Sequence, residues 1–482
     1  MRPNLTLRLL TAFALLSLCF AACKKDMATN SGGNKPSSGI VSFNDSIFDV
    51  FKDIYLWTDA VPDSATFKPD SYPSAGAMFD SLIGFKKDAN GANLDRYSFI
   101  DDGTTSKVLS GQAGDMGFQV GYQTSTELRV VYVYPGSPAD KAGIKRGWQV
   151  TSVNGTTTFG LNTATYTILD NAFSASSATF IFKKPDGTSQ TSTLAAASYS
   201  LNPVLYSHSY TLSGVNVGYL VFNTFVQLSV VQPELDSIFG AWKTAGVNNV
   251  IIDLRYNGGG YAETAEYIAN KLAPTTVANS LMYTAYFNTG VTNGTFGWLF
   301  KTMKATPNYP NYFWTDIYHS EATTYAKTNF AGTTGFFGNG IKLTFLVTHN
   351  TVSASELLYN VLIPSMSPKL VGSQTYGKPT GFIDINFGTT DMFAVCMQNK
   401  NSAGNGDYFS GFSPNISVLD DYTNDWGSFS DPLLKAALLD MGVPASVFAR
   451  QANVESTRSA LIPKFYTQGN KFQGTIQKFK RN

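Results

Sequence analysis

The sequence is poor in the residues that hold metals and form disulfides. Its 482 residues include three cysteines and three histidines, with no Cys/His cluster and no His-Glu-x-x-His segment. The usual patterns of a zinc site are therefore missing. Cys19 lies in an apolar run near the N-terminus and Cys396 in the strand-like segment MFAVCMQ, so we expect a buried thiol and no internal disulfide. We also expect no metal and no organic cofactor.

Charge is also scarce. Charged residues make up 14% of the chain, against about 25% in typical soluble domains, and the formal net charge is +1. No long basic run occurs, so nothing favours nucleic acid as a partner. An aromatic content of 14% and 42 glycines indicate a folded, turn-rich protein with substantial β content. The length predicts roughly two to four domains.

The N-terminus carries a short apolar run behind basic residues. Arg2 and Arg8 precede the segment LLTAFALLSLCFAA, residues 9–22. This arrangement is typical of a signal peptide, and the run is too short to cross a bilayer comfortably. We therefore predict that residues 1–22 are a signal peptide.

Cys23 follows the small residues Ala21 and Ala22, and this junction resembles a bacterial lipoprotein box. The resemblance implies that Cys23 becomes the lipidated first residue of the mature chain, with residues 23–40 as a flexible tether. A plain secretory signal with an incidental cysteine is the alternative. Lys24 stands where an aspartate would favour inner-membrane retention. We therefore expect a lipoprotein of the bacterial cell envelope, at the outer membrane, facing either the periplasm or the outside.

Residues 41–110 are predicted to form a small helical domain. Apolar residues recur at helical spacing in SFNDSIFDVFKDIYLW, and a second helical piece, AGAMFDSLIGF, follows a linker rich in Pro and Ser. The apolar positions of the first piece are Phe43, Ile47, Val50, Phe51 and Ile54.

Residues 111–200 change to short strand-like runs that end in turn residues. The segment GSPADKAGIKRGWQVTSVNG, residues 136–155, resembles the helix-then-strand segment of PDZ domains in bacterial proteases, and GFQVG, residues 117–121, matches their carboxylate-binding loop. The resemblance implies that an extended peptide binds by strand addition. A small β-barrel without a ligand is the alternative. The implied peptide-binding residues are Gly117, Phe118, Gln119 and Val120.

Residues 201–445 alternate strand and helix signals, which indicates an α/β domain. In NVIIDLRYNGGGYAETAEYIANKL, three glycines separate a buried strand from a helix. They serve either a tight turn with positive φ or an anion or oxyanion site at the helix N-terminus. No Gly-Lys-Ser/Thr follows that would mark a phosphate loop. The aromatic-rich insertion 275–341 is expected to be a packing insertion rather than a lid, and the basic tail of the C-terminal extension 446–482 is expected at the surface.

The segment TVSASELL, residues 351–358, admits two interpretations. Ser353 and Glu356 fit a capping box, in which both side chains bind backbone N–H groups of the first turn. Alternatively, Ser353 is a nucleophile at a strand end, next to a helix dipole. A serine nucleophile needs a base. His349 is near in sequence, but strand ends rarely aim both side chains together. Lys378 lies one helix and one strand further on, and a lysine can act as a base when burial lowers its pKa.

The segments DLRYNGGG, SASE and GSQTYGKPTG together resemble the core motifs of the C-terminal processing, or tail-specific, serine peptidases. The resemblance spans roughly residues 41–440. It implies a helical N-terminal part, a PDZ insertion and a ClpP/crotonase-like α/β catalytic domain. In that family the first serine of SASE is the nucleophile and a lysine 25 residues on is its base, which here are Ser353 and Lys378. The resemblance also implies an oxyanion hole made by the backbone N–H groups of Ala354 and of Gly259 or Gly260. It further implies supporting side chains at Glu356 and Thr375.

Two positions depart from the family pattern. Phe382 stands four residues after the lysine, where many relatives carry a glutamine. Pro364 stands eleven residues after the serine, where many carry an aspartate. The resemblance therefore implies a Ser/Lys dyad without an assigned third member.

The sequence thus predicts an envelope-anchored serine endopeptidase that cleaves proteins or peptides near their C-termini after capture by the PDZ domain. Its partners would be polypeptide substrates and, through the lipid anchor, a membrane. A non-catalytic protein that binds peptides or apolar ligands on the same fold is the rival, and the missing glutamine and aspartate favour it. An esterase that uses the same serine is a third possibility.

Overall fold

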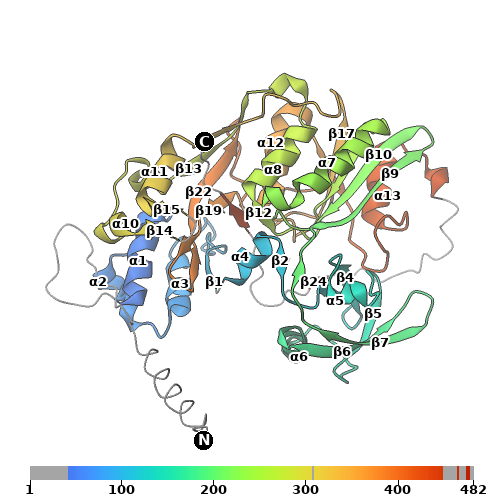
Figure 1. Cartoon of the computed structure of the whole chain (residues 1–482), viewed down its shortest axis with the longest axis horizontal. Coiled ribbons are helices and arrows are strands. Elements are labelled where there is room, and N and C mark those ends of the chain that lie inside the picture. Colours follow the sequence, from blue (N-terminus) through green and yellow to red (C-terminus); the bar gives the residue numbers. More distant parts are fainter. Residues whose placement is uncertain (1–41, 102, 307–308, 449–463, 466–473, 478–482) are drawn as a thin grey trace, which may run out of the picture.

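The structure, a computed structural model, describes residues 42–101, 103–306, 309–448, 464–465 and 474–477. A helical part lies at the left of the molecule, a small mostly β part at the lower right, and a large α/β part above and between them (Figure 1). The fold class predicted from the sequence is confirmed. The predicted signal peptide, Cys23 and the tether lie outside the described residues.

The N-terminal helices share one hydrophobic core with the aromatic-rich insertion. The first helix, α1 (Phe43–Ile54), begins at Ser42, whose side chain accepts a hydrogen bond from the Asp45 N–H at 3.0 Å. Its buried apolar side chains lie in the same cluster as those of the insertion, so the insertion is built into a core. The other elements of this region are α2 (Ser64–Phe67), α3 (Ala75–Ile83), β1 (Phe99–Asp101), α4 (Thr104–Leu109), α9 (Thr289–Thr292), α10 (Trp298–Thr302), β14 (Lys304–Ala305), β15 (Tyr309–Phe313) and α11 (Trp314–Thr323).

The mostly β part is a single antiparallel sheet in the order β24-β3-β4-β5-β6-β7. Phe118 of β3 fills its core, with ring centroids 5.1 Å from Phe173 and 5.2 Å from Phe180. Aromatic side chains from several elements thus hold this small part together. Its elements are β3 (Phe118–Tyr122), β4 (Leu128–Val133), α5 (Pro138–Lys141), β5 (Gln149–Val153), α6 (Thr163–Ser174), β6 (Ser177–Lys183), β7 (Ser189–Ala195) and β24 (Lys464–Phe465). Two short strands, β2 (Gln112–Ala113) and β8 (Tyr199–Ser200), pair at its border.

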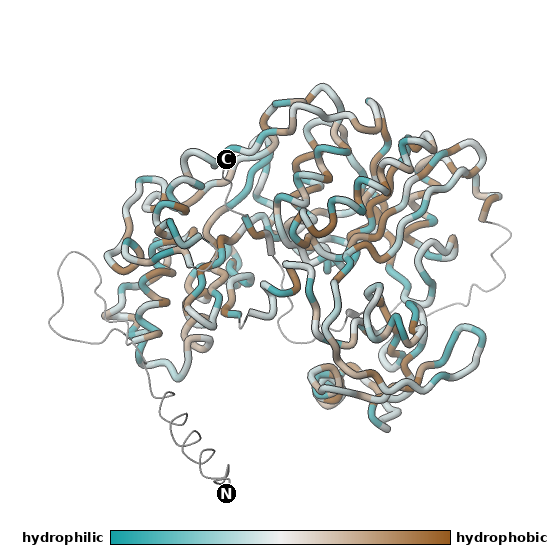
Figure 2. The backbone as a smooth tube through the Cα atoms, in the orientation of Figure 1, coloured by the Kyte–Doolittle hydropathy of each residue, from teal (hydrophilic) through white to brown (hydrophobic). Residues whose placement is uncertain are grey.

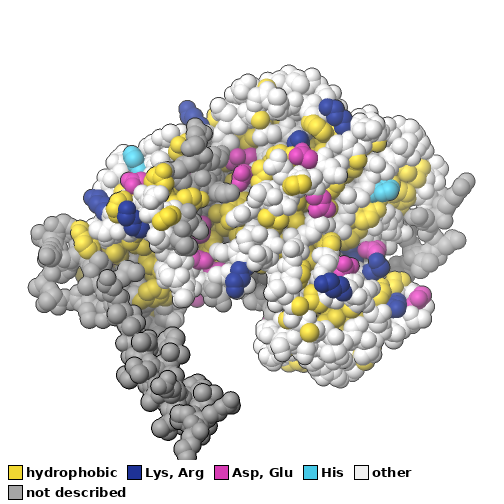
Figure 3. Space-filling model, in the orientation of Figure 1, with side chains coloured by type: hydrophobic (Ala, Val, Ile, Leu, Met, Phe, Trp, Pro, Cys, Tyr) yellow, Lys and Arg dark blue, Asp and Glu magenta, His cyan; other side chains and the backbone are white. Residues whose placement is uncertain are grey.

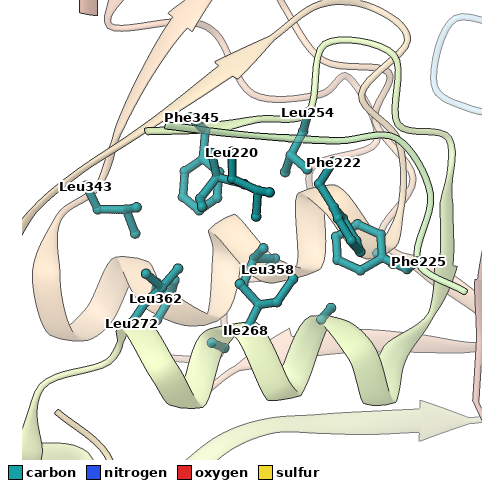
Figure 4. Close-up of a cluster of buried hydrophobic side chains, with 14 of the residues drawn as sticks. Leu220, Phe222, Phe225, Leu254, Ile268, Leu272, Leu343, Phe345, Leu358 and Leu362 are labelled. Atoms are coloured by element: carbon teal, nitrogen blue, oxygen red, sulfur yellow. The ribbon is translucent and has the colours of Figure 1, made fainter. Parts of the chain in front are cut away.

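The α/β part contains a six-stranded sheet in the order β23-β18-β17-β11-β10-β9, parallel except for β9. Alternate side chains of a strand serve opposite layers, so the inner strands β10, β11 and β17 are buried along most of their length. Leu220 and Phe222 of β10 point toward α8 and α12 (Figure 4), while Tyr219 and Val221 pack with α13. The elements are β9 (Val204–Leu212), β10 (Val215–Phe222), α7 (Leu228–Thr244), β11 (Asn249–Asp253), α8 (Ala262–Leu272), β17 (Lys342–Val347), α12 (Ala354–Met366), β18 (Lys369–Gly372), β23 (Ile416–Ser417) and α13 (Pro432–Asp440).

A second six-stranded sheet, in the order β12-β25-β19-β22-β13-β16, includes a C-terminal strand. β25 pairs in parallel with both β12 and β19, and Ile476 and Gln477 are buried. The expectation that the tail lies at the surface is therefore wrong for β25, because sheet pairing on both sides encloses it. The strands are β12 (Gly259–Tyr261), β13 (Leu281–Phe287), β16 (Lys327–Asn329), β19 (Thr380–Phe382), β22 (Val395–Asn401) and β25 (Gly474–Ile476), with β20 (Ile385–Asn386) and β21 (Asp391–Phe393) beside β1.

A buried cluster of charges lies at the carboxyl end of β11. The Arg255 guanidinium lies 2.7 Å from a carboxylate oxygen of Asp253 and 2.8 Å from oxygens of both Asp420 and Asp431. The side chain of Arg255 is fully enclosed. A buried cation of this kind is stable only when its donors are matched by acceptors, so the cluster fixes the loop before α13 to the end of β11.

Arg146, from the turn between α5 and β5, carries this cluster into the small β part. Its guanidinium donates to the carbonyls of Asn424 (2.9 Å) and Asp421 (3.1 Å), and it lies 4.1 Å from the ring centroid of Trp426. Hydrogen bonds and a cation–π contact thus join the small β part to the α/β part at one buried side chain.

The surface shows the low charge of the chain. Hydrophobic residues follow the central strands and the helix faces turned toward them (Figure 2). On the face shown in Figure 3, charged side chains are few and scattered among uncharged ones. Among the described residues, no helix combines the length and apolar character needed to cross a bilayer.

Candidate active site

Ser353 lies where β17 gives way to α12. The strand ends at Val347, and the helix begins at Ala354 with Ser353 as its N-cap. The N–H of Val352 donates to the carbonyl of Asn257 at 3.0 Å, which ties this turn to the glycine turn. Ser353 is fully buried, with φ 60° and ψ −104°, a region that residues with a Cβ rarely adopt. As the first helical residue, Ala354 has an N–H without an intrahelical acceptor.

The carboxylate of Glu356 organises the site. Its Oε2 accepts the N–H groups of Ser353 and Lys378, both at 2.8 Å. Its Oε1 accepts the N–H of Gly377 at 2.7 Å and the hydroxyl of Thr375 at 2.6 Å. Burial raises the pKa of Glu356, and these four hydrogen bonds act in the opposite direction. Because all four groups donate, they fit the ionised carboxylate.

Two consequences follow for the predicted site. The bond from Ser353 N–H to Glu356 is the glutamate half of the capping box that the spacing indicates. The same oxygen also binds the Lys378 N–H at the same distance. Two segments 25 residues apart in the chain are therefore held side by side by one carboxylate.

Lys378 is buried among aromatic rings. Its Nζ lies 3.5 Å from the ring centroid of Phe382 and 5.2 Å from that of Tyr97. Burial lowers the pKa of Lys378 well below its ordinary value, while the carboxylates of Asp95 and Glu356 act in the opposite direction. The net lowering favours the neutral amine, which is the form a general base must have.

The side chain of Ser353 points toward the strand that follows Lys378. Its hydroxyl donates to the carbonyl of Thr380, the first residue of β19, at 3.5 Å. Phe382, whose ring contacts the Lys378 Nζ, ends the same strand. The two groups of the predicted dyad therefore both lie at β19.

Other candidate groups point elsewhere. The Ser355 hydroxyl donates to the carbonyl of Asn257 at 3.1 Å, so it serves the turn. His349 is exposed, with its ring 5.1 Å from that of Tyr376. Within the part of the chain that the structure describes, no group of three or more His, Cys, Asp or Glu side chains could hold a metal ion.

In the glycine turn, the N–H groups of Gly259 and Gly260 point in different directions. The Gly259 N–H donates to Asn257 Oδ1 at 2.9 Å, and the Gly259 carbonyl and the Tyr261 N–H bond the backbone of Phe225 at 2.8 and 2.7 Å. Successive residues of a strand point their N–H groups to opposite edges, so the Gly260 N–H points away from Phe225. Gly260 has φ 137°, and a Cβ there would lie 2.1 Å from the Phe225 carbonyl oxygen. Only glycine fits this position.

Arg96, in the N-terminal part, is a contributor that sequence reasoning missed. It donates to the carbonyls of Tyr376 at 3.1 Å and Phe409 at 3.0 Å, and its guanidinium lies 4.9 Å from the ring centroid of Tyr376. These contacts fix the segment that leads into Lys378. No local pattern around Arg96 points to such a distant loop.

The predicted peptide-binding residues 117–120 lie at the start of β3. The Gly117 N–H donates to Asp115 Oδ1 at 2.8 Å. Further along the strand, Gly121 and Tyr122 pair with β24 on the edge away from β4. The edge that strand addition would use is therefore occupied at Gly121 and Tyr122 by a segment of the same chain.

Comparison with known families finds three matches, in separate segments of the chain. Residues 216–418 match the family described as Peptidase family S41, residues 42–99 match Peptidase S41 N-terminal domain, and residues 129–168 match PDZ domain. Ser353 and Lys378 lie inside the first of these segments.

Curated relatives are similar over part of their length. A carboxyl-terminal-processing protease of Picosynechococcus sp. is 29% identical over 163 residues, which are 33% of this chain and 38% of that protein. The chloroplastic carboxyl-terminal-processing peptidase 2 of Arabidopsis thaliana is 31% identical over 181 residues, 34% of this chain and 33% of that protein. The chain thus spans less than two fifths of the length of these two relatives.

A solved structure shows the same fold over more of the chain. A Bacteroides fragilis protein assigned to the S41 proteases superposes with a TM-score of 0.61 at 23% identity, covering 85% of this chain and 99% of that one. At this identity the likeness concerns the fold alone.

Replacing Glu356 tests whether its carboxylate holds the site. Glu356→Gln keeps the shape but turns an amide N–H₂ toward groups that donate. We expect the free energy of unfolding to fall by about 2 kcal/mol or more, because buried donors lose their acceptor. The measurement is urea denaturation. Glu234→Gln is the matched control, since Glu234 accepts a single bond from Asn202, at 3.2 Å. Equal losses in the two variants would contradict the role of Glu356.

Proposed function

Because this chain belongs to peptidase family S41, we propose that it is a serine endopeptidase that cleaves proteins or peptides near their C-termini, with Ser353 as nucleophile and Lys378 as general base. One observation carries the proposal: the carboxylate of Glu356 accepts the N–H groups of both residues at 2.8 Å. A held nucleophile beside a base of lowered pKa is the arrangement that acyl transfer requires.

In the proposed reaction, the neutral Lys378 amine takes the proton of the Ser353 hydroxyl as Oγ attacks the scissile carbonyl carbon. The carbonyl oxygen takes up the negative charge and accepts hydrogen bonds from the N–H groups of Gly260 and Ala354. The Lys378 ammonium then gives its proton to the leaving amine, and an acyl-enzyme ester remains. Water attacks the ester, Lys378 takes its proton and returns it to Ser353 Oγ, and the new C-terminal carboxylic acid leaves. These steps need only groups of this chain and water.

The small β part is proposed to deliver the substrate. An extended polypeptide would pair with the edge of β3 that faces away from β4, as peptides do in PDZ domains. One end of the bound polypeptide strand would lie at Gly117, in the loop that leads into β3. The support is the match of residues 129–168 to the PDZ domain and the pairing of β24 on this edge.

We further propose that the protein is anchored in the bacterial cell envelope, at the outer membrane, by lipidation of Cys23. The support is the basic and apolar signal-like segment 1–22 directly before that cysteine. A tethered peptidase would meet polypeptides close to the membrane surface.

Ser353→Ala tests the nucleophile. The variant should lose at least about 10³-fold in kcat/KM on an unfolded protein substrate, and should no longer react with a fluorophosphonate probe. Ser355→Ala is the matched control and should keep both properties, because the Ser355 hydroxyl bonds the Asn257 carbonyl. Peptide binding without Ser353-dependent labelling or cleavage would instead support the non-catalytic binding protein. Turnover of small esters but not of peptides would identify an esterase.

The pH dependence tests the base. Burial puts the pKa of Lys378 in the folded protein below its ordinary value, and the proposed base must be unprotonated. We expect kcat/KM to fall as the pH drops through the lowered pKa, and to reach a plateau above it, in a profile measured between about pH 5 and pH 10. Lys378→Arg should show low activity without this rise, since a guanidinium stays protonated. An unchanged rise in Lys378→Arg would assign the titration to another group.

Cys23→Ser tests the anchor. The variant should move from the membrane fraction to the soluble fraction while its peptidase activity is retained, because the change removes only the acylated thiol. Fractionation followed by immunoblotting measures this shift. Cys19→Ser, inside the predicted signal peptide, is the matched control and should stay with the membrane. Membrane association that survives Cys23→Ser would contradict the lipid anchor.

A further inference from the structure

The two C-terminal strands fill two places that would otherwise present open sheet edges. β24 pairs antiparallel with β3, and β25 lies between β12 and β19. In the described sheet, β25 is the strand that links β12 to β19, so without it both facing edges would be unpaired. Unpaired edges accept another extended strand through backbone hydrogen bonds.

The place that β25 fills between β12 and β19 is bordered by the proposed oxyanion donor and by the strand that follows Lys378. The Gly260 N–H points to the edge of β12 that pairs with β25, and Gly260 lies opposite Thr475 in the register. On the other side, the Gln477 N–H donates to the carbonyl of Phe382 at 2.9 Å. β25 thus lies against the proposed oxyanion donor on one side and against the strand beside Lys378 on the other.

β25 also begins beside the glycine turn. Gly474 pairs with Gly259, which is two residues from Asn257. The Asn257 carbonyl accepts the N–H of Val352 at 3.0 Å, and Val352 directly precedes Ser353. β25 therefore starts beside the turn that is hydrogen-bonded to the residue before Ser353.

The end of β25 is anchored by side chains as well as by the backbone. Ile476 is 3% exposed and lies in the hydrophobic cluster that contains Phe382. The Gln477 Oε1 accepts a hydrogen bond from the Tyr283 hydroxyl at 3.3 Å. The place of β25 therefore offers apolar contacts and one polar contact to a strand that occupies it.

The edge of β3 also favours an internal extended segment as its binding partner. The Asp115 carboxylate accepts the Gly117 N–H at 2.8 Å, so a negative charge already stands where a terminal carboxylate would bind. Like charges at short range repel. This favours an internal extended segment over a free C-terminus, and β24, which is followed by further residues of the chain, is such a segment.

We propose that β24 and β25 form a built-in pseudo-substrate that occupies both strand sites and competes with polypeptide substrates for them. The inference rests on the proposed function. A tethered segment has an effective concentration on the order of millimolar near its site, so an external polypeptide must displace it to be cleaved. The preferred substrate is an internal extended stretch with a small residue opposite Gly259 and an apolar residue at the place of Ile476.

Gln477→Pro tests the competition, because proline lacks the N–H that bonds Phe382. We expect KM for an unfolded protein substrate to fall about tenfold, as the loss of a sheet hydrogen bond weakens the competitor, while kcat stays close to that of the unmutated protein. Gln477→Ala keeps the N–H and loses only the side-chain bond to Tyr283, so it should lower KM less than Gln477→Pro does. Equal KM values in the two variants and the unmutated protein would overturn the inference.

Peptide binding tests the same point without catalysis. A fluorescent peptide KFYTQGNKFQGTIQ, the sequence of residues 464–477, should bind Ser353→Ala/Gln477→Pro at least about tenfold more tightly than Ser353→Ala, and a scrambled peptide should bind neither. Equal affinities for the two proteins would overturn the inference. Tighter binding to the double variant, together with no hydrolysis by the unmutated protein, would contradict the proposed function and still support the strand sites.

A measurement on the unaltered tail covers the case in which Gln477→Pro does not fold. In Ser353→Ala, the amides of residues 474–477 should exchange faster with deuterium when a saturating unfolded polypeptide is added. Exchange that stays unchanged while the polypeptide is bound would overturn the inference, since the two strands would then not share a site.

Discussion

The site depends on one buried carboxylate. Glu356 accepts hydrogen bonds from the first turn of α12 and from the segment 375–378, and the Thr375 hydroxyl in turn accepts the N–H of Phe412 at 2.8 Å. A buried charge is costly unless its acceptor positions are used. Here every donor comes from a segment that carries or supports the proposed dyad. The energy that offsets burial of the charge is therefore the same energy that fixes the geometry.

Phe382 gives this site a character of its own. Where the family resemblance implies a glutamine, an aromatic ring lies 3.5 Å from the Lys378 Nζ. A ring face excludes water and supplies no lone pair to orient the amine, although it attracts the charged form. Burial outweighs the nearby carboxylates and lowers the pKa of Lys378. The environment therefore tunes the base mainly by desolvation.

The sequence predicts the parts of the site that depend on local spacing. The pair Ser353 and Glu356 has the spacing of a capping box, and the structure has its glutamate bond. Local spacing could not show that Gly259 and Gly260 differ, because the direction of their N–H groups follows from pairing with Phe225. It also could not predict β25: three residues without periodicity become a strand only through partners far away in the chain. Sheet pairing is non-local, so the sequence pattern alone predicts that such a tail lies at the surface.

Arg146 limits how easily the small β part could be exchanged for the corresponding part of a relative. The small β part has its own core and would pass for an exchangeable module. Yet its arginine donates to two carbonyls of the loop before α13 and stacks on Trp426, beside the acidic cluster around Arg255. A domain transplanted from a relative would leave those acceptors without a donor, unless it brought an equivalent arginine. Under the proposed function, single substitutions along β3 would therefore change the preferred substrate more readily than replacement of the whole domain.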